Sequence, residues 1–206
     1  MKFDLSNYEV LLPPYPLEYQ KWDEAQAQDY LKWFIGKIPE RVDYVCWRYH
    51  KDNFFSRKLD PNDPESLLRI WRWFLPRAKI EQMPKEEAEA HLAAFSHLGG
   101  TWLDTRQLST CTDYVMRDIG MLLGHIFITN YPQLYWTTEK NEKRYIWRWH
   151  PVLKGFVYIV GDKTTYPPFE PVHMVGVQGS RVLDNDAAAS DLFNIYENWE
   201  KQIPRS

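Results

Sequence analysis

The chain has 206 residues, of which 44% are hydrophobic and 26% charged, and its formal net charge is −3. This length suits one large domain with its own core. The slight acidic excess argues against a general nucleic-acid binder, which needs basic residues to neutralise phosphates.

Two cysteines, Cys46 and Cys111, show no spacing typical of a disulfide framework, so we expect a reducing, cytoplasmic setting. The first seven residues lack the apolar core of a signal peptide. No run approaches the roughly eighteen apolar residues of a membrane span, so we expect no membrane association.

Residues 1–22 carry three prolines among apolar and tyrosine side chains, a composition that prevents a helix. We expect an arm packed on a single domain that spans residues 1–206. Asp23 is a predicted N-cap, followed by one helical face up to Ile38. Pro39 should then open a second helix, because proline costs nothing at the first helical position.

The polar segment 51–63 reads as a loop that ends at Asp63 and Pro64, where a third helix should begin. Pro76 stops this helix. A fourth, weakly amphipathic helix is expected from Lys85 to Leu98.

The longest periodic run extends from Leu108 to Ile128, with apolar residues at spacings of three and four. It is apolar on nearly every side, so the predicted helix over about 105–129 must be buried on nearly every side. Gly120 and Gly124 lie one turn apart, which costs stability unless another backbone packs against their face.

Beyond this helix the pattern shifts towards a period of two. Short strands are expected in four segments: 134–138, 144–149, 152–160 and 172–177. Their short connections favour an antiparallel meander, one face of which should cover the central helix. A last helix should be capped by Asn185 or Asp186. The predicted class is therefore α+β, with N-terminal helices, a long buried central helix, a small meander and a C-terminal helix.

Arginine and tryptophan alternate around Trp73, which lies outside the predicted buried stripe of its helix, next to Arg72 and one turn from Arg69. Trp33 likewise lies off the stripe of its helix. An exposed tryptophan beside a cation is typical of a protein interface and also of a base-stacking platform. The acidic balance favours a protein partner, and the alternative is that the arm covers both rings.

Three histidines, His125, His150 and His173, are candidates for a shared pocket, because the last two lie on or beside predicted strands that can approach the helix. A neutral histidine in a cleft can act as a base or bind a ligand. The alternative for His125 is a core histidine with a hydrogen-bond partner. No HExxH, CxxC or phosphate-binding motif is present, so we expect no metal, no cofactor and no assigned catalytic residue.

The segment Asp118–Ile128, with Trp136, Pro151-Val152 and Phe169-Glu170-Pro171, resembles small bacterial proteins of unassigned function, some encoded beside secreted toxins and regarded as immunity proteins. The resemblance covers residues 105–177 at most. It implies a helix followed by strands that carry Trp and Pro, and His125 stands where those proteins have Glu.

Together these observations favour a non-enzymatic cytoplasmic protein that binds another protein. The resemblance implies an immunity protein that neutralises a toxin. The rival hypothesis is a small-molecule-binding protein or enzyme with a histidine-containing cleft.

Overall fold

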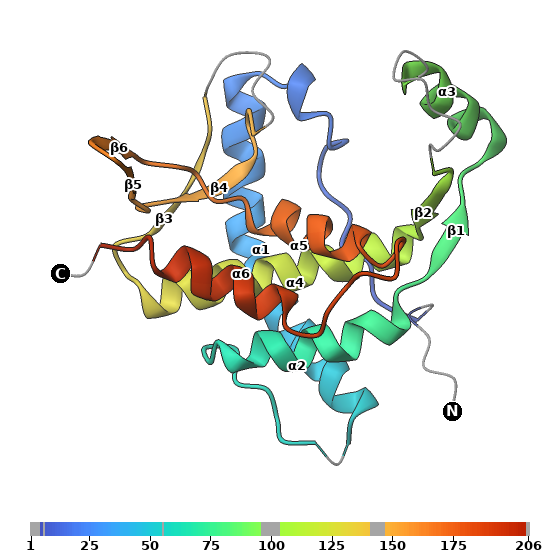
Figure 1. Cartoon of the computed structure of the whole chain (residues 1–206), viewed down its shortest axis with the longest axis horizontal. Coiled ribbons are helices and arrows are strands. Elements are labelled where there is room, and N and C mark those ends of the chain that lie inside the picture. The colour runs from blue at the N-terminus through green and yellow to red at the C-terminus, as the bar shows by residue number, and fades with distance from the viewer. Residues whose placement is uncertain (1–4, 6, 55, 96–103, 141–146, 205–206) are drawn as a thin grey trace.

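The computed structural model describes residues 5, 7–54, 56–95, 104–140 and 147–204. In this part the chain forms six α-helices and three separate two-stranded antiparallel sheets, which confirms the α+β class (Figure 1). The helices are α1 (Glu24–Asp52), α2 (Glu65–Phe74), α3 (Lys85–Phe95), α4 (Thr110–Asn130), α5 (Pro171–Ser180) and α6 (Asp191–Glu200). Two 3-10 turns cover Tyr19–Lys21 and Leu75–Arg77.

Each sheet consists of two strands that are consecutive in the order of strands along the chain. Strand β1 (Ile80–Gln82) pairs with β2 (Arg106–Leu108), β3 (Tyr135–Thr138) with β4 (Pro151–Lys154), and β5 (Tyr158–Val160) with β6 (Lys163–Thr165). The predicted antiparallel pairing is therefore confirmed, but the strands do not form one continuous meander. The predicted strand at 144–149 falls partly on residues 141–146, outside the described residues, and Arg148 makes an isolated bridge to Glu139.

Helix α4 lies in the middle of the molecule, with α1 and α5 packed against it (Figure 1). Ser109 caps its start by accepting a hydrogen bond from the Thr112 N–H. Ten apolar or glycine residues of α4 between positions 115 and 127 are buried, which confirms the predicted burial of this helix. They are Val115, Met116, Ile119, Gly120, Met121, Leu122, Leu123, Gly124, Ile126 and Phe127.

The two glycines of α4 are in contact with different kinds of neighbour. The backbone of Val172 in α5 packs against Gly120, as the sequence predicts. The indole ring of Trp136 in β3 packs against Gly124. The same face of α4 therefore receives both a helix backbone and an aromatic side chain.

Several predicted elements are wrong in type or extent. Helix α4 begins at Thr110 and not near residue 105, because residues 106–108 form β2. Helix α1 continues through Pro39 and does not break there. The proline frees the Ile35 carbonyl from its helical partner, and both residues lie on the exposed side, where water can satisfy that carbonyl. The segment 172–177 is helical, because Glu170 caps α5 and Pro171 occupies its first turn. A short apolar run alone does not distinguish a strand from a buried helix.

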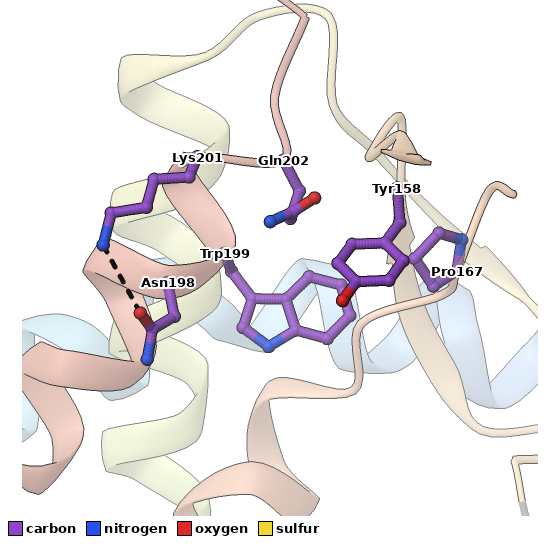
Figure 2. Close-up of a pocket in the computed structure, with 6 residues that line it drawn as sticks. All are labelled: Tyr158, Pro167, Asn198, Trp199, Lys201 and Gln202. Carbon is purple, nitrogen blue, oxygen red and sulfur yellow. Dashed lines mark hydrogen bonds between the residues drawn. The ribbon is translucent and has the colours of Figure 1, made fainter. Parts of the chain in front are cut away.

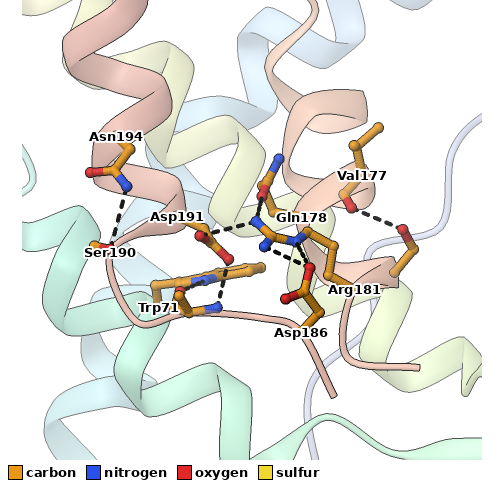
Figure 3. Close-up of polar contacts among 10 residues, drawn as sticks. Trp71, Val177, Gln178, Arg181, Asp186, Ser190, Asp191 and Asn194 are labelled. Atoms are coloured by element: carbon orange, nitrogen blue, oxygen red, sulfur yellow. Dashed lines mark hydrogen bonds and ion pairs between the residues drawn. The ribbon is translucent and has the colours of Figure 1, made fainter. Parts of the chain in front are cut away.

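The last helix begins later than predicted, because residues 181–190 form a turn-rich connection between α5 and α6. Figure 3 shows Arg181 between Asp186 and Asp191, at 2.8 and 3.1 Å. Asn185 has a positive φ of 55° and does not cap the helix, which starts after Ser190. The Trp71 Nε1–H of α2 donates to the Ala188 carbonyl at 3.1 Å, so the connection is tied to α2.

Candidate protein-binding surface

Strands β5 and β6 form a hairpin that projects from the body at the end opposite β1 and β2 (Figure 1). Val160 pairs with Lys163, so Gly161 and Asp162 make a two-residue turn. Gly161 has a φ of +58°, which glycine adopts without strain and which matches the twist of paired strands.

The hairpin carries large apolar side chains in water. All residues of both strands are exposed, Ile159 of β5 to 67%, and Tyr166, which directly follows β6, is 71% exposed. We call Tyr158, Ile159, Val160 and Tyr166 the hairpin surface. Tyr158 and Val160 share one face of β5 and Ile159 lies on the other, because successive residues of a strand point to opposite faces. Both faces of the hairpin therefore expose large apolar side chains, and exposed apolar surface of this kind marks interaction sites on proteins.

A cavity of about 480 Å³ adjoins the hairpin surface, between the hairpin and the end of α6. Figure 2 shows Tyr158 and Pro167 on one side, Trp199 beneath, and polar side chains on the helix side. The polar lining consists of Asn198, Lys201 and Gln202. An apolar floor with a few polar groups at the rim is the usual chemistry of a binding pocket.

The base of the hairpin is packed into the core, although its tip is exposed. Phe156 and Phe169 are fully buried, and both rings contact the Trp199 ring, at centroid distances of 5.0 and 4.5 Å. The Val157 N–H donates to the Gln202 carbonyl at 2.7 Å. The core therefore fixes the cavity floor and the direction in which the hairpin leaves the body.

Trp73, expected at the surface, is buried with 3% exposure, which corrects the predicted interface role. Its Nε1–H donates to the Asp52 carboxylate at 3.0 Å, and the guanidinium of Arg77 lies over its ring at 5.3 Å. Arg72 is exposed and Arg69 is half-buried on the same helix. These two arginines therefore do not flank an exposed tryptophan at position 73.

Trp33 is half-buried and stacks on the Tyr30 ring at a centroid distance of 5.3 Å. It lines a second cavity of about 470 Å³ together with Pro14 and Tyr15 of the arm. The arm therefore borders Trp33, in line with the alternative considered from sequence.

An exposed tryptophan beside a cation occurs at Trp47, a residue that was not among the predicted site residues. Trp47 is 51% exposed, and the Lys51 ammonium lies 4.9 Å from its ring centroid. The signal in the sequence was the spacing of four residues between the two.

Two of the three candidate histidines lie together. The Trp147 ring contacts both His150 and His173, at centroid distances of 5.8 and 4.3 Å. The remaining one, His125, is half-buried elsewhere on α4, where its Nε2 lies 3.1 Å from the Asn62 side-chain oxygen. The predicted alternative, a core histidine bonded to a backbone carbonyl or a tyrosine, is wrong for His125, because this residue is only half-buried and its partner is the side chain of Asn62.

Burial changes the acid–base properties of this region. Desolvation, with a smaller contribution from His173, lowers the pKa of His150 to about 4. Desolvation raises the pKa of the fully buried Glu170 to about 8, although the His173 N–H bonded to this carboxylate opposes the shift. His150 is stacked on the Tyr19 ring at 3.7 Å, so it is part of a packed aromatic cluster.

Within the described residues, no group of three or more His, Cys, Asp or Glu is placed to hold a metal ion. None of the described helices combines the length and apolar character needed to cross a bilayer. Comparison of the chain with protein families, curated proteins and solved structures gave no match.

Proposed function

We propose that this protein works by binding another protein, and that the hairpin surface with its adjoining cavity is the contact. The observation that carries the proposal is the concentration of four exposed large apolar side chains on residues 158–166, next to an aromatic-floored cavity. Burying such side chains against a partner gains about 25 cal/mol for each Å² removed from water.

The hairpin favours recognition of an extended segment of the partner. Strands β5 and β6 form a two-stranded sheet, and across the described part of the chain neither pairs with a third strand. An added strand would complete backbone hydrogen bonds at an outer edge and place a side chain near the cavity. Since each strand has three residues, apolar contacts would supply most of the affinity.

A toxin, the partner that the resemblance to immunity proteins implies, would be one case of this proposal. The binding mode itself requires only a partner with an extended apolar segment. The net charge of −3 would assist association with a basic partner by long-range attraction.

The test compares matched substitutions of two equally exposed apolar residues. Ile159→Lys places a charge on the hairpin surface, and Leu12→Lys places one on the arm, where the native side chain is 68% exposed. We expect wild type and Leu12→Lys to recover the same stoichiometric partner from a host extract, and Ile159→Lys to lose it at least about tenfold. A photo-crosslinking residue at position 159 should then label that partner directly.

Equal recovery by all three proteins, or crosslinking only from other surfaces, would contradict the proposal. Recovery of no stoichiometric partner by the wild type would contradict it as well.

Small-molecule binding is the second candidate, because the cavity beside Trp199 lies within the common size range of ligand pockets. It differs from the histidine cleft expected from sequence, since the cavity lining contains none of the three candidate histidines. A compound that binds there should quench Trp199 fluorescence, and Trp199→Phe should remove that change while the protein stays folded.

A further inference from the structure

The cavity between the arm and α1 has a glycine in its lining that no packing contact requires. Gly36 lies in the interior of α1, and nothing lies within 4 Å of a Cβ built at this position. Glycine is one of the least favourable residues in a helix interior, so alanine would stabilise α1 here. What glycine provides is space, because a long side chain at position 36 would occupy the cavity of about 470 Å³.

Aromatic side chains supply the apolar part of this lining. Trp33 of α1 and Tyr15 of the arm both border the cavity, and both are half-buried. The Tyr30 ring stacks on Trp33 at a centroid distance of 5.3 Å, and the Trp22 ring contacts Tyr15 at 6.1 Å. Core rings therefore support the two lining rings, which offer a fixed apolar surface to the side chain of a ligand.

Among the described residues, two charges of opposite sign in this lining have no ion-pair partner. They belong to Asp29 and Lys32, which are exposed and lie three residues apart on one face of α1. The remaining charged side chain of the lining, Lys37, is already paired with Glu40 at 2.7 Å. The cavity therefore offers one carboxylate and one ammonium group to a ligand, next to aromatic rings.

We propose that this cavity binds a free α-amino acid with an aromatic side chain. Such a zwitterion carries an ammonium group for Asp29 and a carboxylate for Lys32. Its side chain packs against Trp33 in the space that Gly36 leaves. A ligand with a single charge would pair with one of the two charged side chains and be repelled by the other. The site is separate from the hairpin surface and does not depend on the proposed function.

Calorimetric titration of the full chain with L-phenylalanine and three related compounds tests the chemistry of the ligand. The compound 3-phenylpropanoate lacks the ammonium group, 2-phenylethylamine lacks the carboxylate, and free glycine lacks the ring. We expect each of the three to bind at least about tenfold more weakly than L-phenylalanine, because each leaves one part of the lining without its partner.

Substitutions in α1 test where L-phenylalanine binds. Gly36→Leu fills the space beside Trp33 and should weaken binding at least about tenfold. Ala25→Leu is the matched control, because position 25 is exposed on α1 outside the cavity lining, and it should change the affinity less than about twofold. Asp29→Asn should remove the preference for L-phenylalanine over 3-phenylpropanoate, and Lys32→Gln should remove the preference over 2-phenylethylamine.

No binding of L-phenylalanine up to about 10 mM would overturn the proposal. Equal affinity for all four compounds, or equal binding by the wild type and Gly36→Leu, would overturn it as well. If Gly36→Leu does not fold, the Asp29→Asn and Lys32→Gln titrations decide, because both side chains are exposed. Unchanged preferences in these two variants would then overturn the proposal.

Discussion

Gly120 in α4 and Val172 in α5 approach so closely that a Cβ at position 120 would lie 2.6 Å from the Val172 Cα. A backbone atom cannot move aside as the end of a long side chain can. The absence of a side chain at Gly120 therefore sets how closely α5 packs, and α5 in turn fixes Phe169, which lies just before it in the cavity-supporting core.

Gly120→Ala should lower the free energy of unfolding by about 1–3 kcal/mol, because the added methyl group overpacks the contact with Val172. Gly36 in α1 is the matched control, since nothing lies within 4 Å of a Cβ built there. Gly36→Ala should raise the free energy of unfolding by about 0.4–1 kcal/mol. Urea unfolding of both variants measures the difference, and a stabilising Gly120→Ala would disprove the close contact.

Asp118→Asn should cost about 3–5 kcal/mol of stability, because it leaves the buried Arg41 guanidinium without a charged partner. The exposed pair Lys37–Glu40, 2.7 Å long, offers a control on the solvent-facing side of α1, the helix that also carries Arg41. Glu40→Gln should change stability by less than about 1 kcal/mol, since water screens that pair. Similar losses in the two variants, measured by chemical unfolding, would contradict a buried role for Asp118.

The sequence predicted correctly those features that depend on residues close together in the chain, such as a helix cap or the spacing of apolar residues. Asp23 forms a full capping box with Gln26, and the apolar spacing of α4 required burial on all sides. The helix break predicted at Pro39 was wrong, because Ile35 and Pro39 lie on the exposed side of α1, where a helix tolerates proline. The strand predicted at 172–177 was wrong, because the N-cap and the proline that begin α5 make this segment helical.

The candidate surface was less predictable than the fold. The run 152–160 was expected as one apolar strand, but it divides at Gly155, whose φ is +114°, into a buried strand and an exposed one. The sequence pattern cannot tell that Val152 is fully buried whereas Ile159 is exposed, because the exposure of an apolar residue depends on which elements pack nearby. The same reason explains Trp73, which is covered from outside its helix by Asp52 and Arg77.

Trp73→Ala should destabilise the fold by about 3–5 kcal/mol, because the ring is buried and its Nε1–H bonds to Asp52. Trp47 is the matched control, since its ring is half exposed and contacts the Lys51 ammonium. Trp47→Ala should cost less than about 1 kcal/mol. Thermal and urea unfolding measure the stability of both variants. Equal losses of unfolding free energy in Trp73→Ala and Trp47→Ala would refute the burial of Trp73.

His150 should make stability depend on pH below about 6.5. An unfolded histidine takes up a proton near this pH, whereas burial and His173 hold the pKa of folded His150 at about 4. Between these values the unfolded state binds more protons, so the contribution of His150 is fully present above pH 6.5 and is lost as pH falls towards 4. The slope should reach about 1.4 kcal/mol per pH unit in this window.

Comparison with His150→Gln isolates this contribution, because the glutamine keeps a polar side chain beside Tyr19 without titrating. Free energies of unfolding measured from pH 4 to pH 7 should differ between the two proteins by an amount that changes with pH only below about 6.5. Loss of the Tyr19 stacking contact adds a constant offset, which does not affect the slope. Parallel pH profiles would mean that His150 is as accessible to protons in the fold as in the unfolded chain, and that the aromatic cluster at Tyr19 is open to water.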